Sequence, residues 1–272
     1  MKSFVNILSL GIALVAIIST PHLARAATLA VGGTGAVTEA LMLIGPAFTK
    51  ATGITLKVIP DLGTGGGIAA TADGILGLAV AGRTLKEKEA AMGLKVVATF
   101  RTPFGLVTSR PGPDGLASKD IAAIYSADQA TWPDGTPLRI ILRPVGDSDT
   151  MVMGKLFPGL AEALETARLR PDLSVAANDQ DNAAAAEKTD GSLVGITLTQ
   201  IMTEKHNLRF VAIDGVLPSM ASYQDGSYPY GKTLFMMVPT DVSAEATAFL
   251  SFLATPEGEA ILNKVGILAI DE

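Results

Sequence analysis

Apolar residues recur along this chain with two periods, and segments of the two kinds alternate. In residues 35–52, Leu41, Ile44 and Phe48 stand at helical spacing, and Gly53 follows as a typical end of a helix. Residues 75–81 form an unbroken apolar run of strand length, as a buried parallel strand does. Strands are expected at 28–31, 54–59, 75–81, 95–100 and 104–108. This alternation predicts an α/β fold with mixed, mostly parallel sheets and helices on both faces.

A proline- and glycine-rich break at 109–115 separates a second unit. Its expected helices are 121–125, 151–157, 160–170 and 183–188, and its expected strands are 138–142, 192–197 and 209–213. A turn at 225–229, a strand at 233–238 and two helices at 244–253 and 256–265 return the chain to the first unit. We therefore expect two lobes, a discontinuous lobe I of residues 27–107 and 226–272 and a lobe II of residues 108–225. Two crossings permit hinge closure around a ligand.

The first 26 residues have the pattern of a cleaved signal peptide. Lys2 precedes an apolar run at 4–18, and Ala24-Arg25-Ala26 is a small-residue cleavage site. The alternative is a retained signal anchor, although the run is shorter than the roughly 20 residues that a membrane span needs. The chain has no cysteine, which excludes disulfides, thiolate metal sites and an acylated lipid anchor. A free periplasmic protein, monomeric by default, is the expectation.

Three turns rich in glycine, serine or threonine lie between strands and helices, at 32–35, 63–67 and 146–150. Such turns present free backbone N–H groups at helix N-termini, which bind anions. The formal net charge of −6 disfavours nucleic acids and anionic membranes as partners. It does not disfavour a small anion, because salt screens distant charge within about 8–10 Å. The pattern predicts capture of a small oxyanion.

These segments resemble the substrate-binding proteins of ABC phosphate importers, which are two-lobed periplasmic receptors of the type II binding-protein fold. The resemblance rests on ordered landmarks: Gly32-Gly33-Thr34-Gly35, Gly63-Thr64-Gly65-Gly66-Gly67, Gly77 to Arg83, Ile124-Tyr125-Ser126 with Trp132-Pro133-Asp134-Gly135, Asp225 to Pro229, and Thr255 to Gly258. It implies phosphate transport with an inner-membrane ABC permease as partner, no catalysis and no cofactor or metal. The central turn departs from the family pattern R-x-x-x-S-G-T, since Arg143 leads to Ser148-Asp149-Thr150 with one extra residue and an aspartate for the glycine. The acidic residue common after the third strand is also missing, as that region reads Gly82-Arg83.

The expected ligand contacts come from both lobes. They are Thr34, Gly35, Ala36, Thr64, Gly65, Gly82, Arg83, Arg143, Ser148, Asp149 and Thr150. A carboxylate at Asp149, or at Asp147, would repel a dianion unless the ligand carries a proton that the carboxylate can accept. The alternative is that Asp149 only caps the following helix. Likewise Thr34 and Thr64 can be helix caps, Arg143 can pair with a surface acid, and Arg83 can be solvated.

Other functions remain open. Gly146-Asp147-Ser148 is similar to the nucleophile block of secreted hydrolases, but His206 is the only histidine beyond the signal peptide that could act as base. Gly32 and Gly35 with Asp61 form only a weak dinucleotide-binding pattern. Nearer alternatives keep the fold: a receptor for tungstate, molybdate or a phosphonate, a ligand-sensing protein, or an interaction protein without a small ligand.

Overall fold

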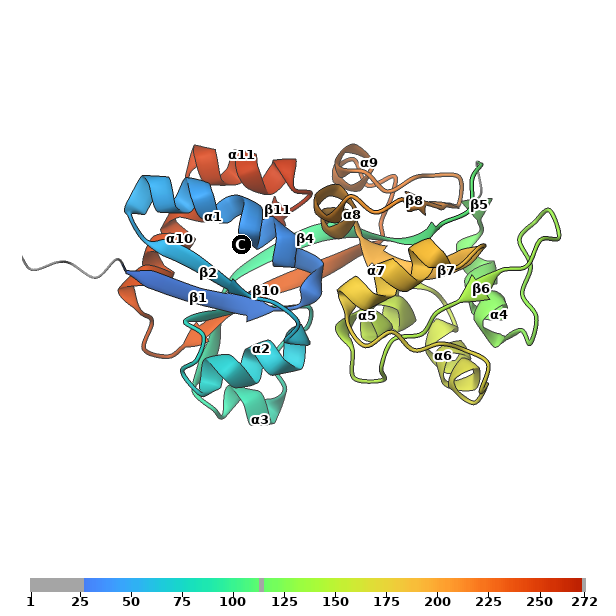
Figure 1. The fold of residues 1–272 in the computed structure, drawn as a ribbon, viewed down its shortest axis with the longest axis horizontal. Coiled ribbons are helices and arrows are strands. Elements are labelled where there is room, and N and C mark those ends of the chain that lie inside the picture. Colours follow the sequence, from blue (N-terminus) through green and yellow to red (C-terminus); the bar gives the residue numbers. More distant parts are fainter. Residues whose placement is uncertain (1–26, 113–114, 271–272) are drawn as a thin grey trace, which may run out of the picture.

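The computed structural model describes residues 27–112 and 115–270. Two α/β lobes lie side by side, and two long strands, β4 (Leu94–Thr108) and β10 (Gly231–Pro239), run between them (Figure 1). The signal peptide predicted for residues 1–26 lies outside the described residues. Within the described ranges, no helix is both long and apolar enough to cross a bilayer.

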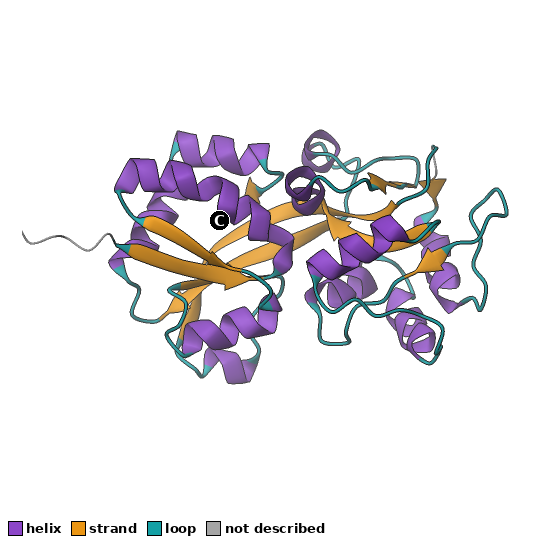
Figure 2. Ribbon diagram, in the orientation of Figure 1, coloured by secondary structure: helices purple, strands orange, loops and turns teal. Residues whose placement is uncertain are grey.

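Lobe I is formed by the two ends of the described chain. Its elements are β1 (Thr28–Gly33), the 3₁₀ helix η1 (Gly35–Val37), α1 (Thr38–Thr52), β2 (Thr55–Ile59), α2 (Gly63–Ala72), β3 (Leu78–Ala81), α3 (Glu87–Ala90), α10 (Ala244–Leu253), α11 (Pro256–Lys264) and β11 (Leu268–Ala269). Helices cover both faces of its strands (Figure 2).

Lobe II is formed by the middle of the chain. Its helices are η2 (Ser118–Asp120), α4 (Ile121–Ser126), α5 (Ser148–Leu156), α6 (Leu160–Arg168), α7 (Asp179–Lys188), α8 (Leu198–Glu204) and α9 (Met220–Gln224). Its strands are β5 (Gly115–Leu116), β6 (Arg139–Ile140), β7 (Ser192–Thr197), β8 (Arg209–Phe210) and β9 (Ala212–Ile213).

One mixed sheet passes through both lobes in the order β2-β1-β3-β10-β4-β7-β6. The outer pairs β1/β2, β1/β3 and β6/β7 are parallel, as the alternating pattern predicts. The crossing strands β4 and β10 pair antiparallel to each other, from Gly231 opposite Pro103 to Pro239 opposite Leu94. The two crossings between the lobes are therefore bound to one another along their length.

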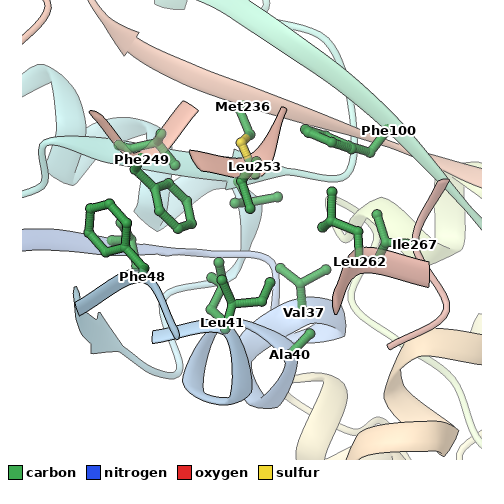
Figure 3. Packing of buried hydrophobic residues seen from close by; sticks show 14 of the residues in the cluster. Val37, Ala40, Leu41, Phe48, Phe100, Met236, Phe249, Leu253, Leu262 and Ile267 are labelled. Atoms are coloured by element: carbon green, nitrogen blue, oxygen red, sulfur yellow. The ribbon is translucent and has the colours of Figure 1, made fainter. Parts of the chain in front are cut away.

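The core of lobe I lies between the sheet and helices α1, α10 and α11. Phe48 from α1 meets Phe249 from α10 edge to face, with ring centroids 5.1 Å apart, and Leu41, Met236 and Leu262 belong to the same core (Figure 3). The helical spacing of Leu41, Ile44 and Phe48 thus gives the buried face of α1. Gly53 ends this helix in the left-handed conformation, with φ of 75°.

A separate core fills lobe II. Along β4 the buried side chains pass from the first core at Phe100 to the second at Phe104, and the return passage falls between Tyr228 and Leu234. Lobe boundaries at 107/108 and 225/226 stay a prediction, because the cores change over within strands rather than at a linker.

Several elements differ from the sequence-based expectation. The strands expected at 95–100 and 104–108 form one continuous strand, β4. Pro103 interrupts the apolar pattern, but it does not end the strand because it lies opposite Gly231, at the end of the ladder with β10. The segment 63–67, expected to be a turn, forms the first residues of α2, which begins at Gly63. Helices α8 and α9 were not predicted, since their sequences lack a clear apolar period.

Candidate functional site

The end of β1 is held against β3 by a contact that only glycine allows. Gly33 has φ of +132°, and a Cβ there would lie 2.0 Å from the Val80 carbonyl oxygen. The N–H of the next residue, Thr34, donates to that same oxygen at 2.8 Å. The chain then turns into η1 with Thr34 buried between the lobes, where its hydroxyl lies 3.4 Å from the Lys232 Nζ.

The start of α2 packs beside this turn. A Cβ on Gly67 would lie 2.5 Å from the Gly33 Cα, so the helix and the end of β1 touch through backbone. The Thr64 hydroxyl accepts a hydrogen bond at 2.9 Å from the N–H of Gly82, the residue after β3. A Cβ on Gly82 would lie 2.6 Å from both the Lys232 Cε and the Ser148 Oγ. Glycine at position 82 therefore lets lobe I close onto α5 of lobe II.

Lobe II presents a buried network of charges at the start of α5. The Asp147 carboxylate caps this helix by accepting from the Asp149 N–H at 2.9 Å. Arg143 Nη2 donates to Asp147 Oδ2 at 2.7 Å and lies 3.5 Å from Asp179 Oδ1 at the start of α7. Burial disfavours an ionised Asp147, but the charge and hydrogen bond of Arg143 lower its pKa below the ordinary value.

An ion pair joins the two lobes at the centre of this site. Lys232, on the crossing strand β10, donates to the Asp149 Oδ1, and both side chains are almost completely buried. Burial raises the pKa of Asp149 to about 7. Burial opposes charge on Lys232, but the carboxylates of Asp149, Asp179 and Asp147 hold its pKa above the ordinary value. The ammonium therefore stays charged, whereas burial favours the protonated form of Asp149.

One strong donor in this network has no acceptor among the described residues. Arg143 is 5% exposed, and its Nη1 is buried without a hydrogen-bond partner. A buried guanidinium N–H left unpaired carries a desolvation penalty. Such a donor favours any acceptor that enters the site.

A second contact between the lobes runs through α7. Gln180 Nε2 donates to the Gly35 carbonyl oxygen at 3.0 Å, and a Cβ on Gly35 would lie 2.5 Å from Asp179 Oδ2. Gln180 Nε2 also donates to the Glu204 carboxylate at 2.7 Å. The turn at 32–35 is thus packed directly against lobe II.

The structure brings together seven of the eleven predicted ligand contacts in this interlobe region. They are Thr34, Gly35, Thr64, Gly82, Arg143, Ser148 and Asp149. The other four have different surroundings. Ala36 is buried within η1, and Gly65 is exposed on α2. Arg83 pairs with Glu89 through two hydrogen bonds of 2.7 Å, and the Thr150 hydroxyl donates to the Pro144 carbonyl oxygen at 3.1 Å. Ligand contact stays a prediction for the whole set.

The helix-cap interpretations are wrong for Asp149 and Thr64, whereas Thr34 occupies the N-cap position of η1 without a capping hydrogen bond. The residue that caps α5 is Asp147, and the Asp149 carboxylate reaches Lys232 instead. Neither Thr34 nor Thr64 accepts a capping hydrogen bond, since η1 has no side-chain cap and α2 is preceded by Leu62. Arg143 does pair with acids, but they lie inside the interlobe region rather than at the surface.

The hydrolase pattern around Ser148 gains no base from His206. The two ring nitrogens of His206 lie 3.1 Å and 3.0 Å from the carboxylates of Glu187 and Glu204. Within the residues that the structure describes, no group of three or more His, Cys, Asp or Glu side chains could hold a metal ion.

Three residues of the site were missed in the sequence. Lys232 is a single cation within an otherwise apolar strand pattern, which is a usable signal for a buried charge with a partner. Asp179 and Gln180 follow Asn178, whose side chain caps α7, so they read as ordinary first-turn residues. Their role depends on α7 packing against η1, which no local pattern reveals.

The two lobes, the paired crossing strands and the interlobe site define the class of two-lobed binding proteins, and comparison with known proteins agrees. A family model described as PBP superfamily domain matches residues 19–257. The chain belongs to this superfamily, which confirms the resemblance at the level of family and fold. No curated protein matches the chain significantly.

Solved structures share the fold at low sequence identity. A putative phosphate ABC transporter substrate-binding protein from Clostridium perfringens, with bound phosphate, is 17% identical with a TM-score of 0.77, covering 90% of this chain and 100% of its own. An ABC-type phosphate transport receptor from Vibrio cholerae is 13% identical with a TM-score of 0.62, covering 90% and 100%. The periplasmic molybdate-binding protein of Azotobacter vinelandii is 16% identical with a TM-score of 0.58, covering 90% and 99%.

Proposed function

We propose that this protein binds a small oxyanion, phosphate or a tetrahedral relative, between its two lobes. The observation that carries the proposal is the buried Arg143 guanidinium, whose Nη1 lacks an acceptor among the described residues. The same buried interlobe network contains Lys232, the Thr34 hydroxyl 3.4 Å from its Nζ, and Ser148 at the start of α5. Donors contributed by both lobes suit a tetrahedral anion.

A few charge-assisted hydrogen bonds can supply the binding free energy that a receptor needs. A micromolar dissociation constant corresponds to about 8 kcal/mol. Each charge-assisted hydrogen bond contributes roughly 1.5–3 kcal/mol net, so a few such bonds suffice after the cost of immobilising the ligand.

The balance of charge explains why Asp149 matters. Two cations, Arg143 and Lys232, face three carboxylates, those of Asp147, Asp149 and Asp179. With every group ionised, the network is negative and opposes an anion. We propose that the ligand takes the place of the Asp149 carboxylate beside Lys232, and that Asp149 then shares a single proton with the ligand. A buried carboxyl whose pKa is about 7 supports this proton sharing.

We further propose that the protein works in the periplasm as the monomeric receptor of an ABC importer and catalyses no reaction. The family, the predicted signal peptide and the transport roles of the Clostridium and Vibrio proteins support this placement. The molybdate-binding protein has the same fold, so molybdate and tungstate are included among the ligands to test.

Calorimetric titration of the purified protein with phosphate, sulfate, molybdate and tungstate tests the proposal. We expect one anion to bind with a micromolar or lower dissociation constant. The same anion should raise the stability of the fold by about 2.7 kcal/mol at a hundredfold excess over that constant. Binding of none of the four would overturn the proposal and favour an interaction protein of the same fold.

A matched pair of arginine variants locates the site. Arg143→Lys keeps the charge but loses the two-pronged guanidinium, so affinity should fall at least tenfold. Arg139→Lys changes an exposed arginine on β6, whose side chain bonds the Asp190 carbonyl oxygen, and should leave affinity within about twofold. Equal effects of the two variants would place the anion elsewhere.

A further inference from the structure

A pocket lined by both lobes lies next to the candidate anion site. It has a volume of about 370 Å³. Its walls come from the segment after β3, from strand β10 and from helix α5, and include Gly82, Lys86, Met151, Val152, Lys155 and Phe235. Because both lobes line it, the pocket exists in this form only when the lobes meet.

Helix α5 connects the two sites. Ser148, Val152 and Lys155 are spaced by four and then three residues, so they lie on one face of the helix. Ser148 meets Gly82 at the anion site, and Val152 and Lys155 line the pocket. At 1.5 Å per residue, this face extends about 10 Å from Ser148 to Lys155.

Gly82 belongs to both sites. It lines the pocket, and a Cβ there would lie 2.6 Å from the Ser148 Oγ and the Lys232 Cε. The contact of Gly82 with Ser148 and Lys232 therefore separates the anion site from the pocket, and it must loosen when one ligand occupies both.

The lining of the pocket combines apolar and basic side chains. Half-buried apolar side chains, those of Met151, Val152 and Phe235, line it. Two exposed lysines, Lys86 and Lys155, add positive charge on opposite lobes. Such a lining suits an apolar arm that ends in an acidic group, whereas a bare tetrahedral anion would leave the pocket unused.

We propose that the natural ligand is an oxyanion with an organic arm, a phosphonate or phosphate monoester whose short apolar chain occupies this pocket. The oxyanion head binds at Arg143 and Lys232, so the inference rests on the proposed function. The arm follows the face of α5 past Val152, and a distal carboxylate lies between Lys86 and Lys155.

A series of ligands tests the arm. Inorganic phosphate, methylphosphonate, propylphosphonate and 3-phosphonopropionate are titrated calorimetrically into the purified protein. Each methylene that becomes buried should strengthen binding by up to about fourfold. Propylphosphonate should therefore bind at least fivefold tighter than methylphosphonate. The distal carboxylate of 3-phosphonopropionate should add a further gain that weakens as salt is raised.

Two matched pairs of variants locate the arm. Val152→Phe fills the pocket, so the ratio of the propylphosphonate to the methylphosphonate dissociation constant should rise at least fivefold. Val175→Phe, at an exposed valine outside the pocket, should leave that ratio unchanged. If Val152→Phe fails to fold, a second pair of variants, Lys155→Ala and Lys188→Ala, gives the test. Both lysines are exposed on lobe II, but only Lys155 lines the pocket. Only Lys155→Ala should remove the advantage of the distal carboxylate.

The outcomes separate the two proposals. If phosphate binds but the longer phosphonates bind no tighter than methylphosphonate, the arm is refuted and the oxyanion function stands. The arm is refuted too if its advantage survives both Val152→Phe and Lys155→Ala. If neither phosphate nor any phosphonate binds, the arm is refuted, and the oxyanion function then depends on the titrations with sulfate, molybdate and tungstate.

Discussion

The two lobes contribute different chemistry to the site that they share. Apart from Lys232 on the crossing strand, lobe I offers close-packed backbone and hydroxyl groups, at Thr34, Thr64 and Gly82. Lobe II offers a charged network around Arg143, with its acids in hydrogen-bonding range. Lobe I sets the shape of the site, and lobe II sets most of its charge.

This difference predicts how each half responds to change. Altering the charged half removes one partner of a buried pair and leaves the other uncompensated, which is expensive in a region shielded from water. Altering the uncharged half adds or removes a few atoms at a packed contact, which has a smaller effect. Substitutions in the two halves should therefore rank by whether they leave a charge behind.

Lys232→Met should have the largest effect, because it leaves the Asp149 carboxylate buried without its cation. We expect a loss of about 3–5 kcal/mol in the free energy of unfolding at pH 8, measured by urea denaturation. The loss should shrink as the pH falls and Asp149 takes up a proton.

Two controls show whether the effect belongs to the pair. The exposed Lys264→Met should change stability by less than about 0.5 kcal/mol. Lys232→Met combined with Asp149→Asn should recover part of the loss, since neither charge then remains unpaired. A double variant no more stable than Lys232→Met alone would contradict the pairing.

The pH dependence of stability should follow Asp149. Its pKa of about 7 in the folded protein exceeds the ordinary value of 3.8, so between these pH values the folded state binds more protons than the unfolded state. This group therefore makes the protein more stable as the pH falls from about 7 to about 4.

Other carboxyls act in the opposite direction. Asp147 has a lowered pKa, so its stabilising contribution is lost as the pH falls. The measurement is therefore the difference between wild type and Asp149→Asn, by urea denaturation from pH 4 to 8, with NMR titration of the Asp149 carboxyl carbon. A midpoint near 4 would show that the pair with Lys232 outweighs burial.

Gly35→Ala tests the uncharged half, with a smaller expected effect. The added Cβ would lie 2.5 Å from Asp179 Oδ2 across the lobes, so it should oppose closure rather than folding of either core. Overpacking of this kind typically costs about 1–3 kcal/mol, and we expect oxyanion affinity to fall correspondingly. Gly146→Ala, where a Cβ meets no atom within 4 Å, is the matched control. Equal calorimetric affinities for the two variants would refute the steric argument.

Most of the fold follows from local pattern. The helical spacing of Leu41, Ile44 and Phe48 identifies the buried face of α1, and the apolar run ending at Ala81 identifies β3. The continuity of β4 does not follow, because Pro103 interrupts the apolar pattern and the strand is held by its ladder with β10. Strand ladders join residues far apart in sequence, and a single chain read locally carries no signal for them.

The site divides in the same way. The glycine turns could be recognised, because close backbone approach at Gly33 and Gly82 demands a particular residue type. The charged partners could not, because Lys232 and Asp149 are 83 residues apart and meet only when the lobes come together. Sequence pattern therefore predicts the residues that shape the site better than those that neutralise it.

Thr64→Val should have the smallest effect of these changes. It removes the hydroxyl that accepts from the Gly82 N–H at 2.9 Å but keeps the size and branching of the side chain. The N–H then lacks a partner in a buried position, at a cost of about 1 kcal/mol in the free energy of unfolding measured with urea. Thr64→Ser retains the hydroxyl and should recover most of that loss. If Thr64→Ser destabilises the protein and Thr64→Val does not, Thr64 acts through its methyl group, and the hydrogen bond to Gly82 contributes nothing measurable.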